Sequence, residues 1–498
     1  MRKAKSFGAS ATSGMMWMSV SVLLSRALLF VMQIVLGFIL DARDYGIFAV
    51  VSVAVAFVGA LQNAGASKML IQKQEQYQVL VRDYTDFALY MGLIGGCALV
   101  ALGSIFGSFY RNPELIYVVS LSALSVPFAS LISIQFARLS IDLRFREMCM
   151  VDFYVATTNV AVVLISAFLG ARYYSIGLGL VVSTIARYFL NRRITPTPIA
   201  SFGLSKAGFL AILGQVKWLI VTGFLTGLSQ QGGYFVLGRA ISAESLGYYY
   251  FGFQLTANIG QLLAQGIGNT LFPIFTAMKQ DPRALNRAFL RASSVIHFAC
   301  SVLCLGVVGF APWLMHFVWR GKWDMAILTT VVIALTLPMR MLSPIGSVTL
   351  DSFGKWRLRT ALLVLDAGGM MLAALVGAYV DDLQGAAIAV ALQRLFSGMV
   401  DFSFAVRILG GRAAEIAGFA ARAFMPFWLP AAALMVVNHT QPLLTSDIHS
   451  ALFSALRTLA AIGIFTALVY SIDRPVIKEV FGVLRKLLLR QTPAAVDS

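Results

Sequence analysis

Four arginines lie inside apolar segments of the chain: Arg26, Arg340, Arg394 and Arg457. A charged side chain in the hydrocarbon layer is costly, so an intramembrane arginine marks a functional site by default. Arg26 is the leading candidate, since Ser19 and Gln33 lie seven residues to either side of it on one helical face. Its planar guanidinium suits a phosphate group. In the alternative interpretation, Arg26 pairs with Asp366 and only pins two helices together.

Arg340 and Arg394 are the next candidates for a cationic, substrate-binding cavity. Arg340 lies between Pro338 and Pro344, so the sequence predicts a broken helix whose freed backbone groups face a cavity. Arg394 lies in the middle of its apolar segment. Either could instead snorkel or form an ion pair, and Arg457 is close enough to its segment's start for snorkelling to explain it better.

A stripe of amide side chains follows one face of a single apolar segment. Its members recur at steps of four, three, four and four residues: Gln254, Asn258, Gln261, Gln265 and Asn269. Amides can join helices through hydrogen bonds, or they can line a wet path and bind sugar hydroxyls. Five amides exceed what helix association needs, and Gln230 and Gln231 add polar groups in the preceding segment, so we favour the path.

Asp366 is one of the few acids within an apolar segment. It could bind a coupling cation, and a simple ion pair is an equal alternative. The four cysteines and four histidines show no ligand spacing, so no metal site is expected. The chain also contains no Walker sequence, and we expect no cofactor.

Composition predicts that these segments cross a membrane. Of the 498 residues, 59% are hydrophobic and 12% charged, with a mean hydropathy of +0.80. A spanning helix needs about 20 apolar residues, and fourteen such runs fit between Gly14 and Ser471. We therefore expect an all-α, polytopic membrane protein of about fourteen transmembrane helices, whose first apolar run is a retained span rather than a cleaved signal peptide.

The net charge of +17 is distributed as a topology signal. One set of connections holds 29 lysines and arginines, and four more cations lie within spans. The opposite set holds only six: Arg43, Arg111, Arg172, Arg239, Arg320 and Lys322. Cations gather on the cytoplasmic side, so both termini are expected there, in a bacterial inner membrane. The sequence contains no basic domain with interleaved aromatic residues, so it does not indicate nucleic-acid binding.

The chain also repeats itself at an ungapped shift of 201 residues. The shift places Trp17 on Trp218, Ala42 on Ala243, Gly46 on Gly247 and Gly65 on Gly266. An even number of spans separates the copies, which predicts two parallel six-helix lobes. The expected parts are an N-terminal lobe (1–200), a C-terminal lobe (201–410), two additional transmembrane helices (411–471) and a basic amphipathic tail (472–498) that lies along the cytoplasmic leaflet.

The first apolar segment, with Trp17 and Arg26, and three later stretches carry a resemblance to a known family: LDARDYGIFAV (Leu40 to Val50), GASKMLIQK (Gly65 to Lys73) and LRFREMCMVD (Leu143 to Asp152). With the repeat and the span count, they make the chain similar to Wzx-type flippases, the polysaccharide transporter branch of the multidrug/oligosaccharidyl-lipid/polysaccharide exporter superfamily. Relatives often carry Gly-Pro where this chain has Asp41-Ala42-Arg43.

The resemblance implies transport of an undecaprenyl-diphosphate-linked oligosaccharide across the inner membrane by alternating access, for exopolysaccharide or O-antigen assembly. Its implied partners are membrane lipid and the polymerase and chain-length or export proteins of the same pathway. A drug or organic-cation antiporter of the same superfamily is the first alternative, although cationic substrates favour acidic cavities. A membrane polysaccharide polymerase or ligase is the second, although the longest outside connection, Asn438 to Ser450, is short for such an enzyme.

Overall fold

The computed structural model describes residues 24–62, 65–278, 280–440 and 448–488, and every regular element within these ranges is helical. The chain forms two compact units. The first unit comprises the chain as far as Phe251 together with Leu363–Ala386, and the second comprises Gly252–Leu362 and the chain from Ala387 onward. These units follow other boundaries than the lobes of 1–200 and 201–410, whose limits stay a prediction from the repeat.

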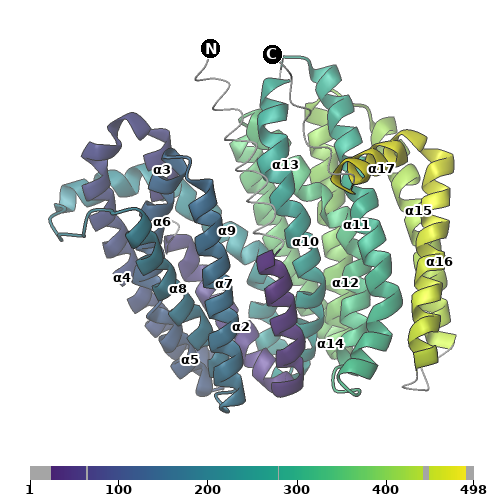
Figure 1. Cartoon of the computed structure of the whole chain (residues 1–498), viewed down its shortest axis with the longest axis horizontal. Coiled ribbons are helices and arrows are strands. Elements are labelled where there is room, and N and C mark those ends of the chain that lie inside the picture. Colours follow the sequence, from purple (N-terminus) through teal and green to yellow (C-terminus); the bar gives the residue numbers. More distant parts are fainter. Residues whose placement is uncertain (1–23, 63–64, 279, 441–447, 489–498) are drawn as a thin grey trace. The chain divides into compact units, whose positions relative to one another are not determined.

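The first unit is built from long helices that pack side by side (Figure 1). In chain order its elements are a helix over 24–39, α2 (Ala42–Gln62), α3 (Ala66–Gln72), the short 3-10 helix η1 (Gln74–Gln76), α4 (Tyr77–Phe109), α5 (Glu114–Ala123), α6 (Val126–Ile141), α7 (Phe145–Phe168), α8 (Tyr174–Ile194), α9 (Lys206–Ala240), the start of α10 (Ala243–Ala277) and the part of α14 (Trp356–Ile408) over Leu363–Ala386. Helix α2 packs on α9, α4 on α5 and α6, and α7 on α8. Ser205 begins α9 by accepting a hydrogen bond from the Gly208 amide, as an N-cap should.

The second unit contains the remaining helices. They are the rest of α10, α11 (Pro282–Val318), the 3-10 helix η2 (Asp324–Ala326), α12 (Ile327–Arg340), α13 (Leu342–Ser352), most of α14 (Trp356–Ile408), α15 (Ala413–Thr440), α16 (Ile448–Ile472) and α17 (Arg474–Leu488). Helix α11 packs against α12, α15 and α16. Its start is fixed by Asp281, which accepts hydrogen bonds from the amides of Arg283 and Ala284, and by Pro282 in the first turn.

Helix α14 is a hairpin rather than one straight rod. Its 53 residues would extend about 80 Å, far more than the roughly 30 Å of a hydrocarbon core. The backbone leaves helical geometry at Asp381 and at Asp382, whose φ is 39°. A Cβ on Gly377 would lie 2.3 Å from the Gly385 carbonyl oxygen, and a Cβ on Gly385 would lie 2.2 Å from that of Gly377. Since eight helical residues span about 12 Å, the chain folds back here.

The break predicted between Pro338 and Pro344 is confirmed. Helix α12 ends at Arg340 and α13 begins at Leu342, with Met341 between them. A proline cannot supply its amide to the helical ladder and crowds the preceding turn, and two of them six residues apart leave one separate helix on each side.

Among the described residues, ten helical segments are long and apolar enough to cross a membrane. The fourteen predicted spans coincide with helical segments, although the start of the first and residues 63–64 of the second lie outside the described residues. Some predicted spans are divided, as in α5 with α6 and α12 with α13, and two are joined in α14. The protein is an all-α, multi-pass membrane protein.

The 201-residue shift relates residues 35–48 to residues 236–249, and each stretch joins the end of one helix to the start of the next. These two stretches, called the repeated hairpins, meet within the first unit through a reciprocal contact. A Cβ on Gly46 would lie 1.8 Å from the carbonyl oxygen of Ala243, and a Cβ on Gly247 would lie 1.7 Å from that of Ala42. Gly46 and Gly247 are related by the 201-residue shift, and so are Ala42 and Ala243. A contact that repeats with its partners exchanged has local two-fold symmetry, so the starts of α2 and α10 are equivalent partners.

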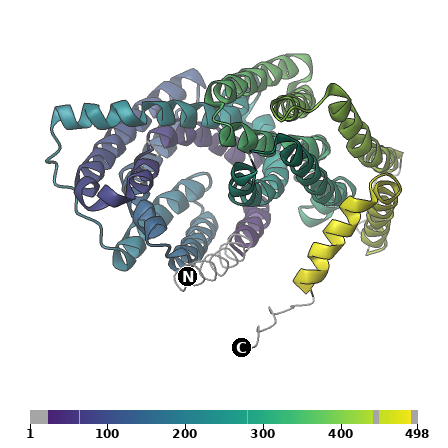
Figure 2. The same ribbon diagram turned by 90° about the horizontal axis from the view of Figure 1, so that it is seen from above.

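Helix α17 packs against α11 and α16, and it is the yellow helix at the lower right of Figure 2. Its residues Val476 and Ile477 are buried in the apolar cluster of the second unit, and Arg291 of α11 forms an ion pair with Glu479. The first turns of the basic tail therefore pack on protein. Whether the tail also lies along a lipid leaflet stays a prediction.

Candidate functional site

Two of the predicted cavity arginines, Arg340 and Arg394, lie on packed helices of the second unit. Arg340 donates through Nη1 to the hydroxyl of Ser397 at 2.8 Å, and that hydroxyl lies 3.2 Å from the carbonyl oxygen of Arg394. The Arg394 guanidinium lies 4.5 Å from the centre of the Phe253 ring, a cation–π contact. Ser397 is buried and both arginines are partly buried. Helices α12 and α14 are thus joined through Arg340 and Ser397, while the Arg394 guanidinium of α14 contacts α10 through Phe253.

A close helix crossing sets this geometry. Gly398 lies directly after Ser397, and a Cβ there would come within 2.4 Å of the Met339 carbonyl oxygen. The same two helical layers approach closely a second time at Gly346 of α13, where a Cβ would come within 2.9 Å of the Asp401 carbonyl oxygen of α14. Glycines allow this backbone approach. The C-terminal end of α12 therefore packs against the part of α14 that follows the turn at Asp381 and Asp382.

Asp401 adds a carboxylate to the face of α14 that carries Arg394 and Ser397. Asp401 follows Arg394 and Ser397 at steps of three and four residues, so all three share one face of α14. Ser343 of α13 donates a hydrogen bond to Asp401, and Arg359 forms an ion pair with Asp351. Sequence reasoning missed Asp401, although the spacing criterion used for the amide stripe would have found it.

The amide stripe begins beside this cluster. Gln254 follows Phe253 directly, and Asn258 lies one turn further along α10; both are partly buried in the second unit. Gln261 and Gln265 lie on the same continuous helix, but their side chains lie outside the described part of the structure. Their role in a substrate path stays a prediction.

Arg26 lies in the first unit, partly buried on the helix over 24–39. Among the described residues, nothing forms a hydrogen bond or ion pair with its side chain, and Ser19 lies outside the described range. The Nε2 of Gln33 on the same helix is buried without a hydrogen-bond partner. The pairing with Asp366, considered as an alternative for Arg26, does not occur among the described contacts.

Asp366 instead receives a hydrogen bond from Ser229 of α9 and is buried in the first unit. Gly232 and Gly233 bring α9 close to Met371 and Met370 of α14, which aligns the two side chains. Gln231 is partly buried two residues beyond Ser229, and Gln230 is exposed. The predicted polar residues are therefore divided between the two units. A search of the described residues finds no group of three possible metal ligands.

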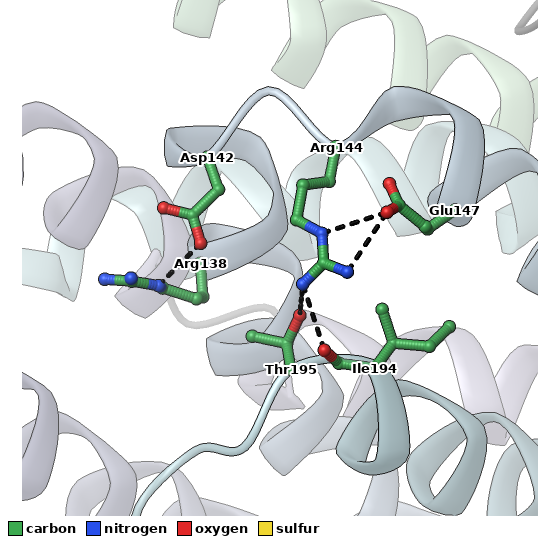
Figure 3. Close-up of polar contacts among 6 residues, drawn as sticks. All are labelled: Arg138, Asp142, Arg144, Glu147, Ile194 and Thr195. Carbon is green, nitrogen blue, oxygen red and sulfur yellow. Dashed lines mark hydrogen bonds and ion pairs between the residues drawn. The ribbon is translucent and has the colours of Figure 1, made fainter.

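The stretch LRFREMCMVD holds one end of the first unit together (Figure 3). Arg144 contacts Glu147 at 3.0 Å and donates to the carbonyl oxygen of Ile194 at 3.0 Å and to the Thr195 hydroxyl at 3.3 Å. Arg138 pairs with Asp142 at 2.8 Å. These contacts fasten the turn between α6 and α7 to the end of α8, which is a structural task.

Asp86 of α4 fixes the segment between α8 and α9. Its carboxylate accepts hydrogen bonds from the amide of Ser201 at 2.7 Å, the amide of Gly203 at 2.9 Å and the Ser201 hydroxyl at 3.1 Å. It is 2% exposed. A buried carboxylate needs such donors. In the sequence, Asp86 only precedes an apolar stretch, so its role in holding the distant segment around Ser201 could not be predicted.

A family comparison agrees with this architecture. Residues 35–328 match the model of a family described as "Polysaccharide biosynthesis protein". The chain belongs to this family. The predicted resemblance to the polysaccharide transporter branch is confirmed.

The relatives of this chain include three curated proteins. A Klebsiella pneumoniae protein described as "Uncharacterized membrane protein in cps region" is 22% identical over 95% of this chain and 97% of its own length. The succinoglycan biosynthesis transport protein ExoT of Rhizobium meliloti is 21% identical over 64% of each chain. The teichuronic acid biosynthesis protein TuaB of Bacillus subtilis is 20% identical over 68% of this chain and 70% of its own.

Solved structures share the fold. The lipid II flippase MurJ in an inward closed conformation matches 91% of this chain and 98% of its own, with a TM-score of 0.70 and 13% identity. An inward-facing multidrug resistance MATE family transporter of the MOP superfamily matches 79% of this chain and 94% of its own, with a TM-score of 0.61 and 12% identity. The transporter fold predicted from the sequence is the one observed.

Proposed function

We propose that this protein is a flippase that moves undecaprenyl-diphosphate-linked oligosaccharide units across the bacterial inner membrane for exopolysaccharide or O-antigen-type biosynthesis. Membership of a polysaccharide biosynthesis family and the names of the relatives ExoT and TuaB support the pathway. The fold shared with the lipid II flippase supports the mode of transport. The strongly one-sided distribution of lysine and arginine supports cytoplasmic termini.

The observation that carries the proposal is the presence of two partly buried arginines, Arg340 beside Ser397 and Arg394 one turn before Ser397 on the same helix. A diphosphate head that enters a low-dielectric region must be met by cations, because an unpaired charge there is prohibitively costly. Arg340 and Arg394 are both partly buried in the second unit: Arg340 donates to the buried Ser397 hydroxyl of α14, and Arg394 precedes that serine by one helical turn. Guanidinium groups bind phosphate oxygens in a fork geometry, so this pair can receive the head group.

The remaining predicted residues take complementary roles in the proposal. Arg26 offers a further cation in the first unit, and the amides Gln254 and Asn258 can bond sugar hydroxyls beside the arginine pair. Asp366 is proposed to serve ion coupling through the site it shares with Ser229. No covalent step is needed, so the protein works as a transporter and not as an enzyme, with the polymerase and export proteins of the pathway as its partners.

Export in cells tests the proposal. Arg26→Ala and Arg394→Ala are each expected to abolish polymer export while the protein still inserts, and Arg26→Lys is expected to rescue only partly, because lysine keeps the charge without the fork. Arg457→Ala is the matched control. Arg457 is also an intramembrane arginine, but it lies on α16, where it contacts the Gly309 carbonyl oxygen of α11 and the side chains of Ser454 and Phe453 on its own helix.

Export by the control variant should stay near that of the unchanged protein. Normal export by both Arg26→Ala and Arg394→Ala would remove the cationic cavity from the mechanism. Purified protein in vesicles that carry a fluorescent lipid-linked oligosaccharide gives the direct readout, since flipping exposes the sugar to an added glycosidase on one side only.

A further inference from the structure

A second cationic pocket lies at the end of the first unit where α2, α5 and α10 begin. Its volume is about 450 Å³, and its polar lining includes Arg43, Arg111, Arg239, Tyr110, Glu114 and Ser242. By the predicted topology this end faces away from the cytoplasm. That side carries only six cations, and three of them line this one pocket.

The charge of the pocket is unbalanced. Arg43 lies 3.4 Å from Glu114, so one arginine is paired. The side chains of Arg111 and Arg239 make no hydrogen bond or ion pair with another described residue. With three arginines and one carboxylate, the lining carries a net charge of +2. Repulsion between the uncompensated cations is relieved when an anion enters.

Tyr110 contributes a neutral wall. Burial raises the pKa of its phenol above the ordinary value, and the hydroxyl donates to the Phe235 carbonyl oxygen at 2.8 Å. Gly238 admits the ring, since a Cβ there would lie 2.8 Å from it. The ring therefore adds no negative charge that would oppose an anion.

The walls of the pocket come from both repeated hairpins. Arg43 and Ile47 belong to the first, and Ser242 and Leu246 belong to the second. These hairpins touch through the Gly46 and Gly247 contacts, so the pocket has its full set of walls only while that contact is made. A ligand that binds one conformation better shifts the population toward it.

We propose that this pocket binds a phosphate-type anion, with a diphosphate as the best match to its charge, and that the bound anion holds the two hairpins together. The site is distinct from the two arginines near Ser397 and goes beyond the proposed transport step. The bound anion acts as a latch, meaning that it stabilises the contact between the two hairpins. Binding of the anion to the pocket can be measured without any transported substrate.

Calorimetric titration of the purified full chain with inorganic diphosphate at fixed ionic strength tests the site. The double variant Arg111→Gln/Arg239→Gln is expected to bind at least tenfold more weakly, because each arginine supplies charge-assisted hydrogen bonds. Arg320→Gln is the matched control: Arg320, like Arg111, has a φ of 53° just after a long helix, but it does not line the pocket. Equal affinity of the double variant and the control would overturn the site.

A second variant tests the latch. Gly247→Ala keeps every lining residue but forces the hairpins apart, so diphosphate affinity should fall about tenfold. Unchanged affinity would overturn the coupling between the anion and the hairpin contact. Because these readouts are binding constants, a protein that binds diphosphate but flips nothing would refute the proposed function and spare the pocket, and the reverse result would do the opposite.

The source of the anion is separated by the lipid environment. Nanodiscs of phosphatidylcholine and nanodiscs containing phosphatidylglycerol are compared in the same titration. A lower diphosphate affinity with phosphatidylglycerol, lost in the double variant, assigns the pocket to a lipid head group. Equal affinities in the two lipids assign it to a free or substrate-borne phosphate, and absence of diphosphate binding in both overturns the proposal.

Discussion

The reciprocal contact between the repeated hairpins makes a sharp prediction for Gly46→Ala. A Cβ at this position would lie 1.8 Å from the Ala243 carbonyl oxygen. Ordinary packing needs roughly 3.4 Å between such atoms, so the hairpins must separate by about 1.5 Å. Overpacking of this kind costs about 1–3 kcal/mol. We expect the free energy of unfolding to fall by that amount.

The matched control lies on the same helix. A Cβ on Gly59 of α2 would meet nothing within 4 Å. Gly59→Ala should therefore be neutral or stabilise by up to about 1 kcal/mol, because alanine is the better helix former. Unfolding of the purified protein in mixed micelles, titrated with SDS and followed by circular dichroism, measures both variants.

The symmetry of the contact predicts how two substitutions combine. Gly46→Ala and Gly247→Ala push the same two segments apart, so the second should cost clearly less than the first. Gly309→Ala is the comparison, since its Cβ would meet Thr458 in the other compact unit, 2.2 Å from Oγ1. Combined with Gly46→Ala, it should be additive within about 0.5 kcal/mol. Full additivity of the Gly46 and Gly247 pair would refute the reasoning.

Three further predictions concern other residues. Asp86→Asn removes the charged acceptor of two amides, so stability should fall by about 1.5–3 kcal/mol and limited proteolysis should cut faster within 195–205. Arg144→Gln removes the hydrogen bond to the Ile194 carbonyl oxygen, so hydrogen exchange should quicken at the end of α8; unchanged exchange would contradict the fastening role. Replacing Gln261 and Gln265 with Leu should harm export without lowering abundance, and a parallel loss of abundance would favour helix association instead.

The sequence predicted the broken helix and the repeat because both leave local marks. Pro338 and Pro344 interrupt a helix wherever it packs, and the observed break at Met341 follows from them alone. Gly46 and Gly247 shared a frame in the 201-residue shift, but their mutual contact depends on how α2 approaches α10. No spacing in a sequence reports which two helices touch.

The candidate site shows the same division. Arg340 and Arg394 could each be identified as an intramembrane cation, because an apolar window exposes any charge within it. Ser397, the partner of Arg340, could not, since a serine in a helix is unremarkable until Gly398 brings α12 close. The pocket around Arg111 was hidden for a related reason: its arginines entered the sequence argument only as the sparse cations of one side.

What the sequence determined by itself is the all-α membrane architecture, since each apolar segment must satisfy its own backbone hydrogen bonds in lipid whatever its neighbours are. Tertiary structure alone decided which polar groups meet. Asp86 and Ser201 are 115 residues apart, and Ser229 and Asp366 are 137 apart. Such pairs form where small residues let helices approach, and that approach is a property of two surfaces rather than of one segment.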